Sequence, residues 1–210
     1  MKNDRKSSVI ISDPSEAEVK KYLDKWESLD KYKRQEESLD LLFKDTFRDN
    51  KDIHAILLKA SVLNTFYSTN IFDVDKVARH IYDLKIDDRL AKSDEKLVND
   101  IAKVDVGNKT MDFYSFASKY CSHHKPEDYP IYDDYVKSIL SYFKTRDHFT
   151  KTLVKDFRDY KNFKNAIKDF QEYYGLKQFN LKEVDRYLWQ VGKENFPKQY
   201  GRKSDKNKTM

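Results

Sequence analysis

Apolar residues recur at helical spacing through most of this chain of 210 residues. After Asp13-Pro14, which is a typical start for a helix, the apolar positions follow at intervals of three and four: Val19, Tyr22, Leu23 and Trp26. Clean alternation of apolar and polar residues is scarce, and the chain has only four glycines and four prolines. The sequence therefore predicts an all-α fold.

The same spacing predicts where the helices lie. One domain is expected over residues 13–197, with a flexible N-terminus at residues 1–12 and a flexible basic tail at residues 198–210. Residues 86–93 are expected to be a short connection. The expected helices cover approximately residues 14–32, 35–48, 53–64, 73–82, 93–103, 113–124, 133–140, 153–174 with an interruption near 161, and a final helix that starts after 180.

The net charge and the cysteine content indicate which partners and which cellular compartment to expect. The net charge of +5 comes mainly from the tail, where five basic residues accompany one acidic residue, so the body is close to neutral. Such a tail serves solubility or contacts phosphates. The single cysteine, Cys121, excludes an internal disulfide. With no apolar run long enough for a membrane span or a signal peptide, a cytoplasmic monomer without membrane association is expected.

The stretch from Phe113 to Leu140 is the most informative part of the chain. Pro130 cannot lie inside a helix, and it favours an extended conformation for Tyr129. Asp133 therefore falls near the start of the helix that follows. There its carboxylate meets the positive end of the helix dipole and can cap free N–H groups. A helix cap is the simplest interpretation of Asp133.

Two segments are candidates for contact with a ligand. Residues 64–70 form an uncharged polar and aromatic cluster after the most apolar helix, either as a closing turn or as a binding loop. Gly107-Asn108 predicts a tight turn, and a helix, a glycine turn and a second helix can offer backbone N–H groups to a DNA phosphate. A simple helix C-cap explains the glycine equally well. The candidate DNA-contacting residues are Gly107, Asn108, Lys109, Thr110, Asn64, Thr65, Phe66 and Tyr67.

No metal or cofactor is expected. Cys121, His123 and His124 lack the second ligand pair that a zinc site needs. The acidic residues between 127 and 134 are explained as caps and as a solvated face. The chain contains neither a phosphate-binding loop nor a dinucleotide fingerprint.

Three segments, in order and spacing, resemble the helix-hairpin-helix DNA glycosylase superfamily, in particular its archaeal and bacterial 8-oxoguanine DNA glycosylase branch. Leu57–Asn64 looks like the buried helix that leads to the DNA-probing loop. Phe116–Tyr120 together with Pro130–Val136 looks like the second hairpin helix and the catalytic aspartate segment. Val184–Trp189, followed by Gly192-Lys193, is similar to the C-terminal signature.

The resemblance implies a helix-hairpin-helix fold and an enzyme that flips a damaged or modified base out of double-stranded DNA and excises it. Asp133 would be the catalytic carboxylate, which stabilises positive charge on the sugar as the glycosidic bond breaks. A base pocket with aromatic walls is required, and the resemblance suggests Tyr114, Ser115, Tyr132 and Trp189 for it.

The sequence departs from this family at the nucleophile. Members with lyase activity carry a lysine where Ser115 stands here, and a serine cannot form a Schiff base. Lys109 and Lys119 are the nearest lysines, and Lys109 is the alternative nucleophile. We therefore expect a monofunctional glycosylase. The alternatives are a catalytically inactive DNA-binding module of the same fold, and a helical protein-interaction domain in which Asp133 only caps a helix.

Overall fold

The computed structural model describes residues 10–197, and it is mostly helical, as the sequence predicts. Residues 1–9 of the expected flexible N-terminus and the whole basic tail, 198–210, lie outside the described residues. The elements in chain order are α1 (Glu16–Glu27), α2 (Asp30–Asp40), the π-helical η1 (Leu41–Thr46), α3 (Ile53–Tyr67), α4 (Val74–Leu84), α5 (Asp87–Ala91), α6 (Leu97–Ala102), β1 (Lys103–Val106), β2 (Lys109–Asp112), α7 (Tyr114–His124), α8 (Asp134–Asp147), the 3-10 helix η2 (Val154–Arg158), α9 (Tyr160–Tyr173) and α10 (Leu181–Asn195).

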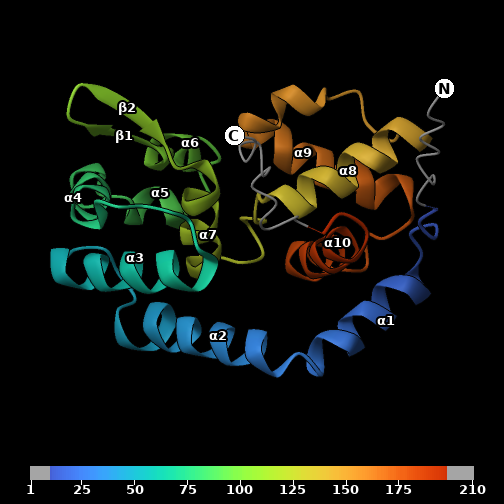
Figure 1. Cartoon of the computed structure of the whole chain (residues 1–210), viewed down its shortest axis with the longest axis horizontal. Coiled ribbons are helices and arrows are strands. Elements are labelled where there is room, and N and C mark those ends of the chain that lie inside the picture. Colours follow the sequence, from blue (N-terminus) through green and yellow to red (C-terminus); the bar gives the residue numbers. More distant parts are fainter. Residues whose placement is uncertain (1–9, 198–210) are drawn as a thin grey trace, which may run out of the picture.

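The helices form two groups, and α1 and α2 run along one side of both (Figure 1). One group contains α3 to α7 and the small hairpin β1–β2, and the other contains α8, α9 and α10. Helix α1 packs on α10, while α2 packs on α3, so the N-terminal helices connect the two groups. The segment between α7 and α8, which carries Asp133, passes from one group to the other.

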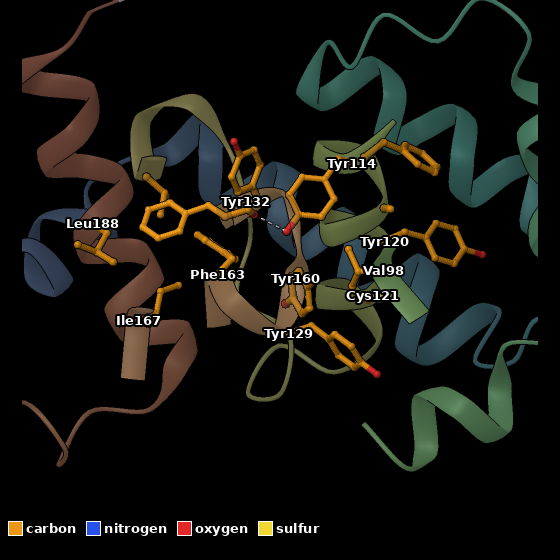
Figure 2. Packing of buried hydrophobic residues seen from close by; sticks show 14 of the residues in the cluster. Val98, Tyr114, Tyr120, Cys121, Tyr129, Tyr132, Tyr160, Phe163, Ile167 and Leu188 are labelled. Atoms are coloured by element: carbon orange, nitrogen blue, oxygen red, sulfur yellow. Dashed lines mark hydrogen bonds between the residues drawn. The ribbon is translucent and has the colours of Figure 1, made fainter. Parts of the chain in front are cut away.

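Aromatic side chains fill the core between the groups. Figure 2 shows Tyr114, Tyr132, Tyr160 and Phe163 gathered beside α7 and α9. The ring of Tyr132 packs against those of Tyr114 and Phe163, with centroids 4.6 and 5.2 Å apart. The buried hydroxyl groups have partners: Tyr114 donates to the carbonyl of Phe157, and Tyr160 donates to that of Pro130. Much of the high aromatic content is therefore structural.

Several expected helix boundaries are wrong. The first helix ends at Glu27 rather than near residue 32, because both the N–H and the hydroxyl of Ser28 bond back to the carbonyl of Lys25. The expected connection at 86–93 contains the short helix α5, which is anchored by the buried side chains of Ile86 and Leu90. Helix α3 continues beyond residue 64 through Tyr67.

The glycine turn was expected to join two helices, but it joins two short strands instead. Lys103–Asp112 makes an antiparallel hairpin, in which Val106 pairs with Lys109 across a two-residue turn. Gly107 takes the first turn position with φ +64°, a conformation that glycine adopts without strain. Val104 is buried, while its neighbours Lys103 and Asp105 face solvent. This alternation of buried and exposed side chains is typical of a strand rather than of a helix.

Ile11, in the N-terminal segment that the sequence predicts to be flexible, contacts the helical domain. The side chain of Ile11 is buried. Its N–H donates to the hydroxyl of Tyr142 at 3.3 Å, and its carbonyl accepts from Arg146 at 3.0 Å. The chain before α1 therefore packs against α8.

A buried amine organises the connection between η1 and α3. Lys59 is completely buried, and its Nζ donates to the carbonyls of Phe47 and Asp49 at 3.2 and 2.8 Å and to Asn50 Oδ1 at 2.7 Å. Desolvation lowers the pKa of Lys59 to about 8, although Asp87 and Asp49 act in the opposite direction. The hydroxyl of Tyr120 in α7 also donates to Asn50 Oδ1, so the network joins three segments.

Replacing Lys59 by Met should therefore destabilise the protein. Lys59→Met keeps most of the side-chain volume but removes the donor to the carbonyls of Phe47 and Asp49 and one of the two donors to Asn50 Oδ1, at a cost of about 3 kcal/mol in the free energy of unfolding. Urea denaturation followed by circular dichroism measures this change. The control is Lys20→Met, which removes an exposed ion pair with Glu16 and should change stability by about 0.5 kcal/mol or less. Equal stability of the two variants would contradict this role of Lys59.

Among the described residues, no helix combines the length and apolar character required to cross a membrane.

Candidate active-site cleft

A cleft of about 670 Å³ lies between the two groups of helices. Its walls come from the α1–α2 region, the end of α3, the start of α7, the segment before α8, and α10. The residues that line it are Trp26, Lys31, Tyr32, Gln35, Glu36, Phe66, Tyr67, Ser68, Thr69, Asn70, Asp112, Phe113, Tyr114, Ser115, Phe116, Lys119, His123, Ile131, Asp133, Asp134, Tyr135, Arg158, Lys182, Asp185, Arg186, Trp189 and Lys193. A volume of this size is in the range of small-molecule binding sites.

Asp133 lies in this cleft as the N-cap of α8. Its backbone is extended, and its Oδ1 accepts from the N–H of Val136 at 2.9 Å. The capping position expected from Pro130 is therefore confirmed. Only one carboxylate oxygen takes part in this cap, and the side chain is half-buried and lines the cleft. Asp133 can cap the helix and face a ligand at the same time.

Asp185, in the first half of α10, is the most buried acidic residue that lines the cleft. It is only 7% exposed, and the N–H of Ile131 donates to its carboxylate. Its Oδ1 has no hydrogen-bond partner among residues 10–197. Burial, together with the negative charge of Asp133, raises the pKa of Asp185 to about 8. Asp185 is therefore mostly protonated at neutral pH, and it can donate a hydrogen bond or a proton.

Close packing of two helices sets the spacing between these acids. A Cβ at Gly192 would lie 2.4 Å from the carbonyl oxygen of Tyr135, far inside contact distance. Gly192 therefore lets α10 approach the first turn of α8. This approach places Asp185 near Asp133, which explains a glycine in the middle of a helix where it is otherwise unfavourable.

Lys119 and Ser115 occupy the α7 side of the cleft. Lys119 is only 3% exposed, and its Nζ donates to Ser115 Oγ at 2.6 Å. The amine also lies 5.2 Å from the centre of the Tyr67 ring. Because the two residues are one helical turn apart, the lysine side chain reaches back along α7 to Ser115.

A cluster of aromatic rings around Trp189 also lines the cleft. Trp189 packs against Tyr32, Trp26 and Tyr135, with ring centroids 5.0, 5.9 and 6.3 Å apart. The amine of Lys193 lies over Tyr32 and Trp189, at 4.3 and 4.6 Å from their centroids. Such a cluster offers flat apolar surface with positive charge at its edge, which suits a base and the phosphates beside it.

Tyr67 closes the α3 end of the cleft. Its hydroxyl lies 3.0 Å from His123 Nε2, while part of the ring remains exposed. Burial lowers the pKa of His123 to about 3, so the imidazole is neutral and can share a hydrogen bond with the tyrosine. Next to this pair, Glu36 forms ion pairs with Lys182 and Arg186.

The structure brings together some of the predicted site residues. Asp133, Phe66, Tyr67, Tyr114, Ser115 and Trp189 line the cleft. Tyr132, which was predicted for the base pocket, does not line this cleft, because its ring is buried against Tyr114 and Phe163.

The other residues for which the sequence predicts DNA contact do not line the cleft. Gly107, Asn108, Lys109 and Thr110 are exposed on the hairpin, whose second strand ends at the cleft residue Asp112. The alternative nucleophile Lys109 is therefore not part of the cleft wall. Asn64 holds the loop after α3, and Thr65 bonds back to its own helix.

Sequence reasoning missed Asp185, Lys119 and His123 as cleft residues. Asp185 falls among the apolar positions of an amphipathic helix, and a charged residue on a buried face is the signal that could have identified it. Lys119 and His123 are likewise buried in an almost wholly buried helix, α7. Within residues 10–197, no three His, Cys, Asp or Glu side chains are grouped as a set that could hold a metal ion.

Comparison with known proteins gives relatives without an assigned activity. The family model described as HI_0787_N, N-terminal domain, matches residues 18–128. A protein from Haemophilus influenzae with the name "Uncharacterized protein" is 46% identical over 158 residues, which cover 75% of this chain and 73% of the relative. No solved structure matches the chain. The family match includes the α7 side of the cleft and ends before Asp133.

Proposed function

This chain belongs to the HI_0787_N family, and we propose that it is a DNA glycosylase that extrudes a modified or damaged base from double-stranded DNA and excises it. The observation that carries the proposal is the combination of groups in one cleft. Asp133, the protonated Asp185 and the aromatic rings of Tyr32, Tyr67 and Trp189 all line it. This combination matches what cleavage of an N-glycosidic bond requires.

Cleavage of the glycosidic bond needs a negative group beside the sugar and a hydrogen-bond or proton donor beside the base. As the bond between the sugar and the base breaks, the sugar becomes positive and the base takes up the bonding electrons. Asp133 stabilises the sugar and orients the water that attacks it. Asp185 donates a hydrogen bond or its proton to the departing base. The proton released by the attacking water passes to Asp133 or to solvent, which balances the step.

The walls of the cleft bind the base that leaves the stack. Trp189, Tyr32 and Tyr67 supply flat surface, while Lys119 and Asp185 supply buried polar groups that can recognise the edge of a base. The hairpin with Gly107 to Thr110 leads into the cleft wall at Asp112. We assign this exposed hairpin, together with the end of α3, to contacts with the phosphates of the flanking duplex.

The proposed activity is monofunctional. Ser115 stands where lyase-active members of the glycosylase superfamily that the sequence resembles carry a lysine, and the amine of Lys119 is a donor to Ser115. Lys109 projects from the hairpin outside the cleft wall. Hydrolysis by water is therefore favoured over attack by an amine.

A panel of duplexes that each carry a different modified base tests the proposal. Wild-type protein should release one or more of these bases and leave abasic sites, which break only after treatment with alkali. Borohydride should trap no covalent complex between protein and DNA. A trapped complex that is lost in Lys119→Gln but kept in Lys109→Ala would instead identify Lys119 as a nucleophile. Binding without release would indicate an inactive DNA-binding module, and an absence of DNA binding even at low salt would favour a protein-interaction domain.

A further inference from the structure

The first two turns of α2, residues 30–37, make few apolar contacts with the rest of the protein. Leu39 is the only buried side chain of this helix, and it lies beyond these two turns. No side-chain hydrogen bond caps the N-terminus of α2, where Leu29 is the N-cap residue. A short helix with so little burial is marginally stable, so residues 30–37 depend on contacts made by their polar side chains.

Polar and charged contacts hold residues 30–37 against α10. The carboxylate of Glu36 forms ion pairs with Lys182 and Arg186, and all three side chains remain partly exposed to solvent. The amine of Lys193 donates to the hydroxyl of Tyr32 and lies over its ring. Because water and salt compete with partly exposed contacts of this kind, each of them contributes little to stability.

The chain on either side of residues 30–37 is anchored more firmly, and to a different group of helices on each side. Before them, α1 packs on α10, and the carbonyl of Tyr22 accepts from the buried amide of Gln190 at 2.8 Å. After them, Phe43 of η1 is buried and packs against Tyr120 of α7, with ring centroids 5.2 Å apart. Residues 30–37 therefore connect two fixed points, one in each group (Figure 1).

Residues 30–37 also form part of the cleft wall. Four of them line the cleft: Lys31, Tyr32, Gln35 and Glu36. The ring of Tyr32 packs against that of Trp189 in α10, with centroids 5.0 Å apart. Local unfolding would lengthen this segment from roughly 12 Å as a helix to roughly 26 Å when extended. The anchored ends can therefore stay in place while Tyr32 and Glu36 leave α10, which widens the cleft and uncovers Trp189.

We propose that residues 30–37 act as a gate that unfolds locally, detaches from α10 and thereby opens the cleft at Trp189. In the closed form, Tyr32 and Lys193 cover part of the Trp189 ring, so a ligand that stacks on this ring binds the open form. The free energy of opening lowers the apparent affinity of the cleft and limits how fast a ligand enters or leaves. The gate requires no particular reaction, and only its effect on base release rests on the proposed glycosylase function.

Hydrogen exchange of the free protein measures the opening directly. The backbone N–H groups of residues 34–37 should exchange at least a hundredfold faster than those in the middle of α10, because only the gate has to unfold. Glu36→Gln removes the charge that forms both ion pairs with α10, and it should speed exchange at residues 34–37 about tenfold further. The control Glu172→Gln breaks an exposed ion pair with Lys177 and should leave this exchange unchanged.

Tryptophan fluorescence gives an independent measure of the same opening. The chain contains two tryptophans, Trp26 and Trp189, and the centre of the Tyr32 ring lies 6.2 and 5.0 Å from the centres of theirs. Detachment of the gate removes Tyr32 from both rings and exposes them to solvent. Acrylamide should therefore quench Glu36→Gln more strongly than wild type, while Glu172→Gln should match wild type.

A covalent link tests whether the opening controls the reaction. In the double variant Glu36→Cys, Lys182→Cys, a short bis-maleimide joins the gate to α10, and the natural Cys121 is buried and protected from the reagent. The linked protein should regain slow exchange at residues 34–37. It should also release bases from the panel of duplexes at least tenfold more slowly than the same variant capped with N-ethylmaleimide.

The outcomes distinguish the gate from the glycosylase function. Exchange at residues 34–37 that is as slow as in α10, in wild type and in Glu36→Gln alike, would show a rigid wall and overturn the gate. Base release that is equally fast in the linked and in the capped protein would overturn its control of the reaction. If no protein releases a base while residues 34–37 exchange rapidly, the glycosylase function fails and the gate stands.

Discussion

Asp133→Asn is expected to abolish most base release while the protein stays folded and bound to DNA. The amide oxygen can still accept from the N–H of Val136, so the free energy of unfolding should fall by about 1 kcal/mol or less. The loss of negative charge beside the developing sugar cation should lower the single-turnover rate by about a hundredfold or more. Quenched-flow or gel-based release assays at saturating protein measure this rate directly.

The matched control is Asp159→Asn. Asp159 is the N-cap of α9 and accepts from the N–H of Asn162, three residues later, as Asp133 does from Val136, but it does not line the cleft. This variant should lose similar stability and no activity. If Asp133→Asn releases the base as fast as wild type, Asp133 is only a helix cap and the catalytic assignment is wrong.

Asp185→Asn is expected to slow base release on the order of a hundredfold as well, because it removes the acidic proton from the cleft. The rate of wild type should fall as the pH rises through about 8, where Asp185 loses its proton. The variant should lack this fall. A rate that equals that of wild type, or a pH profile shared by both proteins, would exclude Asp185 as the acid.

The same substitution should increase stability in a manner that depends on pH. The pKa of Asp185 is raised from the ordinary value of 3.8 to about 8 in the folded protein. Between these values the unfolded chain ionises while the folded protein stays protonated, so this group makes wild type progressively less stable as the pH rises. Relative to wild type, Asp185→Asn should therefore gain on the order of 3 kcal/mol between pH 5 and pH 8. Thermal or urea unfolding of both proteins across this range measures the difference.

Asp133→Asn and Asp185→Asn distinguish a catalytic role of each residue from a structural role. A residue that only supports the fold would lose stability and activity together. For Asp185 we expect activity to fall while stability rises, which is the behaviour of a group that is kept buried for its chemistry. A loss of both would indicate that the carboxyl supports the packing of α10 on α8.

Local sequence rules were sufficient where neighbouring residues decide the conformation. Pro130 and the position of Asp133 predicted the start of α8, and the final helix was predicted to start after residue 180, where Asn180 and Glu183 form the capping box of α10. The apolar spacing predicted a mostly helical fold. In each case the controlling contacts lie within a few residues of one another, so the sequence already contains them.

Elements with weak local signals were predicted less well. The hairpin Lys103–Asp112 was predicted only as a tight turn, because strands of four residues show little alternation of apolar and polar residues. Burial of Val104 stabilises one face of the hairpin, and this contact is not visible in the local sequence. The break at Ser28 was missed because the apolar spacing continues across it. Tyr132 was placed in the base pocket, although packing against Phe163 from a distant helix turns its ring into the core.

The sequence by itself determined the helical character of this protein and the capping position of Asp133, because both depend on contacts between near neighbours in the chain. Only the tertiary structure decided that Asp133 shares a cleft with Asp185 and Lys119. Residues 119, 133 and 185 lie on three separate segments, and they meet because Gly192 lets α10 approach α8 and because α7 packs on the other side. The raised pKa of Asp185 follows from that burial and proximity, which spacing along the chain does not reveal.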